Sequence, residues 1–175
     1  MGRFQKTFRS FRNDNSISAS DLKRMQQELL SYYTGEFSAE YKQQNGGKSP
    51  DAQNYFQQLD KDSIVLQYHY IQANRNPLGS KHLLDQAEDK SSYSRLHNRI
   101  HPIIRNYLEK FGYYDIFLVD PETGDIVYSV FKELDYSTSL IDGPYAQTNF
   151  GEAFRKANAA NNKDAVVLVD YAQYT

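Results

Sequence analysis

The sequence contains no cysteine, no tryptophan and no long apolar run, and two of these absences exclude whole classes of protein. Without cysteine the chain has no disulfide framework, no thiolate metal site and no cysteine nucleophile, and its redox compartment stays open. No stretch of about 18 apolar residues occurs, so no segment is expected to span a bilayer. The opening residues, MGRFQKTFRSFR, also lack the apolar centre of a signal peptide.

Charge and motifs exclude further functions. The formal net charge of -2, without a dense run of Lys and Arg, offers no attraction to a phosphate backbone, so no nucleic-acid partner is expected. The chain has no P-loop, no G-x-G-x-x-G, no nucleophile elbow and no S-x-x-K pattern. His97 and His101 stand four residues apart, as paired zinc ligands do, but no third ligand is indicated. We therefore expect no metal, no cofactor and no enzymatic activity.

What the sequence has in quantity is aromatic residues, with 15 Tyr and 10 Phe among 175 residues. Tyrosine is favourable on partly solvent-exposed surfaces and in pockets, because its ring is apolar and its hydroxyl is polar. The length fits one domain that buries a sizeable core, with or without a helical extension.

The first hundred residues have helical spacing. Phe4, Phe8 and Phe11 predict a helix at the start of the chain, which packs on a neighbour or lies on a membrane surface. After a break, Ser18 or Ser20 is placed to cap a second helix over residues 22–41. These two segments make the N-terminal region helical.

Two more helices are predicted before the chain changes character. Ser49 is placed as an N-cap with Pro50 at the first helical position. After a turn at residues 76–79, a helix over 92–111 carries Leu96, Ile100, Ile103, Tyr107 and Phe111 on one side. Gly112 is its predicted C-cap, and Pro102 should kink it near His97 and Asn98.

Past Gly112 the apolar period changes from 3.6 to 2. Residues 114–120 and 125–132 predict an antiparallel hairpin, with Pro121 and Gly124 supplying the turn. A helix over 150–160, a turn at 161–164 and a third strand over 165–171 follow. Helices first and a sheet with a helical crossover afterwards predict an α+β fold.

The strongest candidate for a site is a binding pocket between one face of the second strand and the segment 131–149. Alternation places Tyr128 and Lys132 on one face of that strand. Lys132, Asp135 and Tyr145 then offer a cation, an anion and a hydroxyl that would orient a small polar ligand. The alternative is that these are rim residues of a loop that only packs on the sheet.

Three stretches resemble a known family. LQYHYIQANRNPLGSK, the run from YSRLHNRIHPIIRNYLEKFG through YYDIFLVDPETGDIVYSVFKELDYSTSL, and GPYAQTNFGEAF are similar to the extracytoplasmic PAS-like (Cache-type) sensor region of bacterial methyl-accepting chemotaxis proteins. Such a region is also found ahead of sensor histidine kinases and nucleotide cyclases. The likeness covers nearly the whole chain, and it is specific to the sensor region rather than to the output domain.

The resemblance implies an N-terminal long-helix region (1–111) followed by a PAS-like antiparallel sheet (112–175) that is truncated at its C-terminus. The family's sheet has the strand order 2-1-5-4-3, so loss of the last two strands would leave one edge of 114–119 open. We expect a second copy, or a rearranged third strand, to fill that edge. A homodimer is therefore expected.

The resemblance also implies a function, namely ligand sensing outside the cytoplasm by a membrane-anchored chemoreceptor of the bacterial inner membrane, with this part in the periplasm. Its partner would be a small polar ligand or a periplasmic binding protein. Family members that bind amino acids use an Arg, Tyr and Asp set, and this sequence does not match the spacing of that set. Lys132 would replace the carboxylate partner, and Asp135 or Asp170 the amine partner, so the ligand class stays open. A kinase or cyclase sensor, and a protein-interaction module that takes no ligand, remain the alternatives.

Overall fold

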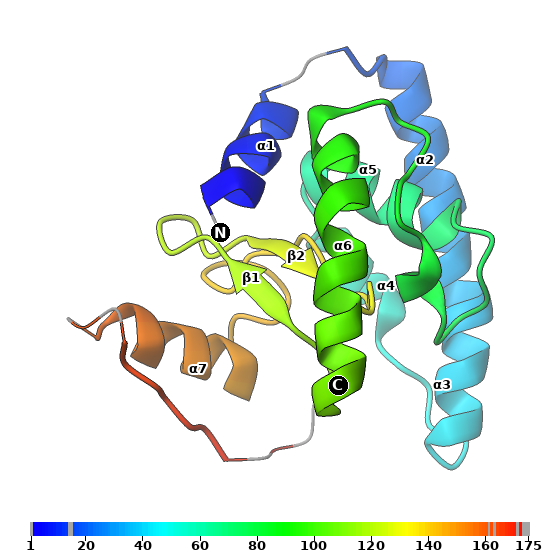
Figure 1. Cartoon of the computed structure of the whole chain (residues 1–175). Helices are drawn as coiled ribbons and strands as arrows, with labels where there is room; N and C mark the ends of the chain where they lie inside the picture. Colours follow the sequence, from blue (N-terminus) through cyan, green and yellow to red (C-terminus); the bar gives the residue numbers. More distant parts are fainter. Residues whose placement is uncertain (1, 14–15, 161, 163, 171, 173–175) are drawn as a thin grey trace.

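The computed structural model describes residues 2–13, 16–160, 162, 164–170 and 172. It mixes helices with a two-stranded antiparallel sheet, as expected for an α+β fold. The elements are α1 (Gly2–Arg12), α2 (Ala19–Tyr32), η1 (Tyr33–Phe37), α3 (Ser38–Gln44), α4 (Ala52–Gln57), α5 (Lys61–Gln67), η2 (Tyr68–Gln72), η3 (Lys81–Leu83), α6 (Ser92–Phe111), β1 (Phe117–Val119), β2 (Ile126–Ser129) and α7 (Asn149–Asn158). The η1 and η2 segments are π-helical turns, and η3 is a 3-10 turn. Figure 1 shows the hairpin among α1, α6 and α7, with α2 and α3 beyond α6.

Helix α1 packs on the hairpin and on α6, so the prediction of a packed helix is confirmed. Phe4 and Phe8 are buried, and the ring of Phe4 lies 4.7 Å from that of Tyr128 in β2. On the polar side, the guanidinium of Arg9 lies 2.8 Å from the carboxylate of Asp120 at the hairpin turn. The first and last thirds of the chain therefore share one core.

The long helix predicted over 22–41 is present as the continuous run α2–η1–α3, from residue 19 to residue 44. Ser18 is its N-cap, because the Ser18 hydroxyl accepts a hydrogen bond from the Asp21 amide at 3.1 Å. The π-helical turn η1 interrupts the run, and such turns often occur at functional sites.

The predicted start of the next helix at Ser49 and Pro50 is wrong by two residues. Helix α4 begins at Ala52, because the backbone of Asp51 (φ -84°, ψ 48°) is still outside the helical region. The turn predicted at 76–79 is confirmed, since the Ser80 amide donates to the Pro77 carbonyl and Gly79 has a φ of +80°.

Helix α6 has the predicted ends. The Ser91 hydroxyl accepts from the Ser94 amide at 2.9 Å, and Gly112 closes the helix with a φ of +69°. Pro102 lies inside the helix without ending it.

The apolar face predicted for α6 is only partly right. Leu96 is buried, but Ile103, Tyr107 and Phe111 are exposed. The buried face runs instead through Tyr93, His97, His101 and Leu108, among other residues. Histidine can occupy a buried face when its ring nitrogens form hydrogen bonds within the protein. A hydrophobicity pattern does not detect such hydrogen bonds.

The predicted hairpin is confirmed, with shorter strands than the sequence suggested. Phe117 pairs with Ser129 and Leu118 with Tyr128, and a bulge follows before Val119. Gly124 has the positive φ (+72°) that the turn requires. Beyond the paired residues the chain bends away, because Asp115 and not a strand partner holds the amides of residues 130 and 131.

The helix predicted over 150–160 is confirmed as α7, whereas the third strand is wrong over residues 165–170. That segment forms no strand in the described part of the chain, and Val166 and Leu168 are 85% and 90% exposed. Tyr171, and Asn161 and Lys163 of the turn predicted before the strand, lie outside the described residues. A β-branched composition favours a strand only where a partner edge is available.

A search of the described helices for membrane spans found none with the length and apolar character that crossing a bilayer requires.

Candidate functional site

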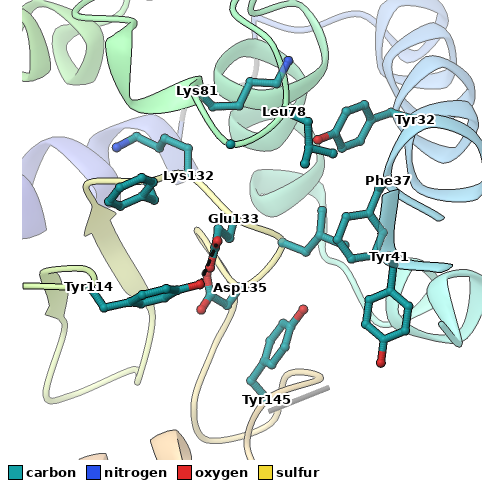
Figure 2. A pocket seen from close by; sticks show the side chains of 13 residues that line it. Tyr32, Phe37, Tyr41, Leu78, Lys81, Tyr114, Lys132, Glu133, Asp135 and Tyr145 are labelled. Carbon is teal, nitrogen blue, oxygen red and sulfur yellow. Dashed lines mark hydrogen bonds between the residues drawn. The ribbon is translucent and has the colours of Figure 1, made fainter. Parts of the chain in front are cut away.

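A pocket of about 270 Å³ opens where the chain leaves β2, between that loop, the α2–η1–α3 helix and the 78–81 turn (Figure 2). Its wall consists of Tyr32, Phe37, Tyr41, Leu78, Gly79, Lys81, Tyr114, Phe131, Lys132, Glu133, Leu134, Asp135 and Tyr145. Most of these side chains are aromatic or aliphatic, with a few charged groups among them. This is the composition expected of a small-molecule site.

The loop that forms the floor of the pocket is fixed by specific contacts. The carboxylate of Asp115 accepts hydrogen bonds from the amides of Val130 and Phe131, at 2.9 and 3.3 Å. The Gln67 amide group donates to the main-chain carbonyls of Leu134 and Tyr136, at 2.9 and 2.8 Å. These hydrogen bonds hold the loop at residues 130–131 and at residues 134 and 136, and the residues between them line the cavity.

The opposite wall comes from the long helix. Tyr32 ends α2, Phe37 ends the π-helical turn and Tyr41 lies one turn further on. The rings of Phe37 and Tyr41 lie 6.0 Å apart, so they form a continuous aromatic surface. A ligand in the pocket would thus touch both halves of the molecule.

The ammonium groups of the two lysines in the pocket wall do not point into the cavity. Lys81 donates from Nζ to the Asn74 carbonyl at 2.8 Å, and Lys132 donates from Nζ to the Ser129 carbonyl. Both side chains are almost completely buried, and in Figure 2 both ammonium groups point away from the space between Glu133 and Tyr145. Their positive charge is therefore directed into the protein.

The carboxylates, in contrast, lie beside the cavity. Asp135 is 2% exposed, and Glu133 lies at the rim, where its Oε1 accepts from the Tyr114 hydroxyl at 3.4 Å. Partial burial of the Glu133 carboxyl group, together with the negative charge of Asp115, raises the pKa of Glu133. Burial also raises the pKa of the Tyr145 hydroxyl well above its ordinary value. Burial disfavours charge of either sign, so only the contribution of Asp115 bears on negative charge in particular.

Of the residues predicted to form the site, Lys132, Asp135 and Tyr145 line this pocket, and Tyr128 and Asp170 do not. Tyr128 is fully buried in the core between α1 and α6. Asp170 is exposed, and its main-chain carbonyl accepts from the Asn149 side chain at 2.7 Å.

The pocket also lies in a different place from the one predicted. All four residues of β2 are buried, because both faces of the strand are covered, and none of them lines the cavity. Sequence reasoning missed Tyr32, Phe37, Tyr41 and Tyr114 as lining residues. Phe37 and Tyr41 lie in the helix predicted over residues 22–41, and helical spacing gave no sign that they would line a cavity.

A second cavity of about 380 Å³ adjoins the first and shares Phe37, Tyr41, Leu134 and Tyr145 with it. Its remaining wall comes from Pro144 and from residues within 49–58. The rings of Tyr55 and Tyr145, which both line this second cavity, lie 5.4 Å apart.

His97 and His101 do not form a metal site in the part of the chain that the structure describes. Their rings stack 4.2 Å apart, and His101 donates from Nε2 to the His82 carbonyl and accepts at Nδ1 from the Tyr128 hydroxyl. Burial lowers the pKa of His101 to about 3, so this ring is neutral near pH 7. No group of three or more His, Cys, Asp or Glu side chains suited to a metal occurs among the described residues.

Comparisons with protein-family models, with curated proteins and with solved structures found no match for this chain.

Proposed function

We propose that this chain is the ligand-sensing part of a membrane-anchored bacterial chemoreceptor, lies outside the cytoplasm and binds a small molecule in the aromatic pocket. The observation that carries the proposal is the position of that pocket. It lies between the loop that follows β2 and the long helix α2–η1–α3, so one ligand contacts both. The chemoreceptor assignment itself rests on the resemblance of the sequence.

Sensing requires that the ligand prefer one of two arrangements of the protein. A coupling free energy of about 1–3 kcal/mol is enough to change an output several-fold or more. The π-helical turn η1 contributes Phe37 to the pocket wall and interrupts the hydrogen bonding of the helix. A packed helix with such a turn has discrete alternative positions, which a ligand against Phe37 and Tyr41 would bias.

The composition of the pocket favours binding over catalysis. Among the described residues that line it, none is a serine, a threonine or a histidine, and the two lysines, which could act as nucleophiles, direct Nζ to main-chain carbonyls instead of the cavity. We therefore retain a receptor role without bond making or breaking. The output domain of the parent protein would be that of a chemotaxis receptor, a histidine kinase or a nucleotide cyclase.

A protein-interaction module is the second candidate, and one observation favours it. Ile103, Tyr107 and Phe111 form an exposed stripe on α6, and the ring of Tyr113 stacks 6.0 Å from that of Tyr107. Exposed aromatic surfaces of this kind are enriched at protein interfaces. A periplasmic binding protein would be the expected partner.

The proposed function is tested by thermal unfolding with panels of amino acids, organic acids and amines. A ligand at one hundred times its Kd adds about 2.7 kcal/mol to the free energy of unfolding, which raises Tm by about 5–10 °C for a chain of this size.

A pocket-filling variant shows where the ligand binds. Leu78→Trp fills the cavity without removing a polar group, and should abolish the rise in Tm. Leu83→Trp adds the same side chain at an exposed position outside the pocket, and should leave the rise intact. Absence of stabilisation by every class of compound would argue against ligand sensing and favour the interaction module.

A further inference from the structure

The lysines of the pocket wall are not available to a ligand anion. Lys81 and Lys132 are the only cationic side chains among the described residues that line the pocket. Each ammonium group donates to a main-chain carbonyl, that of Asn74 for Lys81 and that of Ser129 for Lys132. The two residues are only 6% and 2% exposed. A ligand carboxylate or phosphate would therefore lose hydration in the pocket without gaining a cationic partner, which is unfavourable.

The carboxylates of the wall offer little to a ligand cation. Glu133 is exposed at the rim, where its Oε1 accepts a hydrogen bond from the Tyr114 hydroxyl at 3.4 Å. An ion pair with an exposed carboxylate adds little affinity, because water screens the attraction. Asp135 is 2% exposed and already interacts within the chain. A charge of either sign on the ligand thus gains little in this pocket.

Apolar side chains, in contrast, reach the cavity from each of the three segments around it. They are Phe37 and Tyr41 from the long helix, Leu78 from the 78–81 turn, and Phe131 and Leu134 from the loop after β2. All except Leu134 are only half-buried, so the protein leaves part of their surface uncovered. A ligand with an apolar surface of its own would cover this area, and burial of apolar surface on both partners favours binding.

The rings on the two sides of the pocket favour an aromatic ligand. The rings of Phe37 and Tyr41 lie 6.0 Å apart and are tilted by 42°. Those of Tyr114 and Phe131 lie 6.3 Å apart and are nearly parallel, at 18°. Figure 2 shows Phe37 and Tyr41 across the cavity from Tyr114. A ligand ring between these two pairs would make the offset or edge-on contacts that aromatic groups prefer.

The volume of the pocket limits the size of the ligand. An apolar cavity of about 150 Å³ is large enough to hold benzene. This pocket has a volume of about 270 Å³. It therefore has room for one aromatic ring with a substituent, or for two fused rings.

From this geometry we infer that the pocket binds a small uncharged aromatic compound in preference to organic acids, amines and amino acid zwitterions. The inference rests on the proposed function, because it names the ligand class of the same pocket. It differs from the small polar ligand that the resemblance of the sequence implies. The ring of the ligand packs among the apolar side chains of the helix, the turn and the loop, and Lys132 has no direct contact with it.

Two sets of probes that share a ring separate charge from shape. Benzyl alcohol is compared with benzoate and benzylammonium, and 3-methylindole with indole-3-acetate and tryptamine, by isothermal titration calorimetry on the whole chain. At least one of the two uncharged compounds should bind, and at least about tenfold more tightly than either ion of its set, because an ion loses hydration without gaining a partner. An ion that binds as tightly as its uncharged counterpart overturns the inference.

A charge introduced into the pocket wall locates the binding site. Leu78→Lys places an ammonium group beside the cavity, and should weaken binding of the uncharged compound about tenfold or more while strengthening binding of benzoate. Leu83→Lys adds the same group at an exposed position outside the pocket, and should keep the wild-type order of affinities. The wild-type order in both variants overturns the inference.

A second pair of variants tests the aromatic wall without adding charge. Tyr41→Ala removes a half-buried ring from the wall and should weaken binding of the uncharged compound by about threefold to tenfold. Tyr41→Phe restores the ring without the hydroxyl, and should recover most of the lost affinity. Unchanged affinity in Tyr41→Ala, or an equal loss in both variants, overturns the inference.

The amino acids, organic acids and amines of the unfolding panel separate this inference from the proposed function. If one of them raises Tm and Leu78→Trp abolishes that rise, while neither benzyl alcohol nor 3-methylindole binds, the ligand class is wrong and ligand sensing stands. If no probe of any class binds, the proposed function fails, and the ligand class fails with it.

Discussion

Lys132 is the residue whose environment departs furthest from what its type suggests. Its backbone has a φ of +60°, which is uncommon for a residue with a Cβ, and its side chain is buried among tyrosine rings. Burial lowers the pKa of Lys132 to about 7, and the negative charge of Asp115 partly opposes that shift. The sequence predicted Lys132 as a cation that faces a ligand, whereas the fold directs its ammonium group to the Ser129 carbonyl inside the protein.

This burial predicts a pH dependence of stability. The pKa of Lys132 is about 7 in the folded protein and 10.5 when unperturbed, so between these values the unfolded chain binds more protons. The free energy of unfolding should therefore rise from pH 7 to pH 9. Lys132→Met removes the titrating group and should flatten this rise, as urea unfolding at pH 7, 8 and 9 would show. The exposed control Lys110→Met should keep the slope of the wild type, and equal slopes in all three proteins would contradict the burial of a charge.

At the scale of elements, the sequence predicted helix ends and turns correctly where one residue is enough to form them. The ends of α6 are set by Ser91 and Gly112, and the hairpin turn by Gly124, and each acts through its own backbone or side chain. The start of α4 is different, because the Ser-Pro-Asp sequence offers several capping registers and the sequence alone does not choose among them.

The N-cap of α6 can be tested directly. Ser91→Ala removes the hydroxyl that accepts from the Ser94 amide, and should lower the free energy of unfolding by about 1 kcal/mol. Ser92→Ala, one residue later, removes a hydroxyl outside the capping position and should change stability by less than about half of that. Urea denaturation of both variants measures the difference, and equal losses would show that the cap contributes nothing.

At the scale of the whole molecule, the sheet of the described residues has two strands, whereas the core joins elements from all along the chain. One hydrophobic cluster joins α1, the long helix, α6 and the hairpin. Strand β1 pairs only with β2 in the described residues, so its other edge has no strand partner there. The β-prone segment 165–170 exposes Val166 and Leu168. An open edge and an exposed apolar segment favour association with another copy.

We therefore predict that the chain associates with itself. Size-exclusion chromatography with light scattering should give a mass of two or more copies at tens of micromolar protein. The double variant Val166→Lys, Leu168→Lys should be monomeric, because both charges would be buried in the contact. Ile141→Lys, at another exposed apolar position, is the matched control and should associate like the wild type. A wild-type monomer at all concentrations would contradict the prediction.

Local signals in the sequence were enough to predict the capped helices, the Pro-Gly hairpin turn and the α+β order. It also placed Lys132, Asp135 and Tyr145 near one another, because all three follow one strand within a short stretch of chain. Which groups face the cavity depends on how the elements pack together. The directions of the Lys132 and Lys81 ammonium groups, the burial of Tyr128 and the aromatic wall from residues 32–41 depend on contacts between distant segments, and periodicity within one segment carries no information about them.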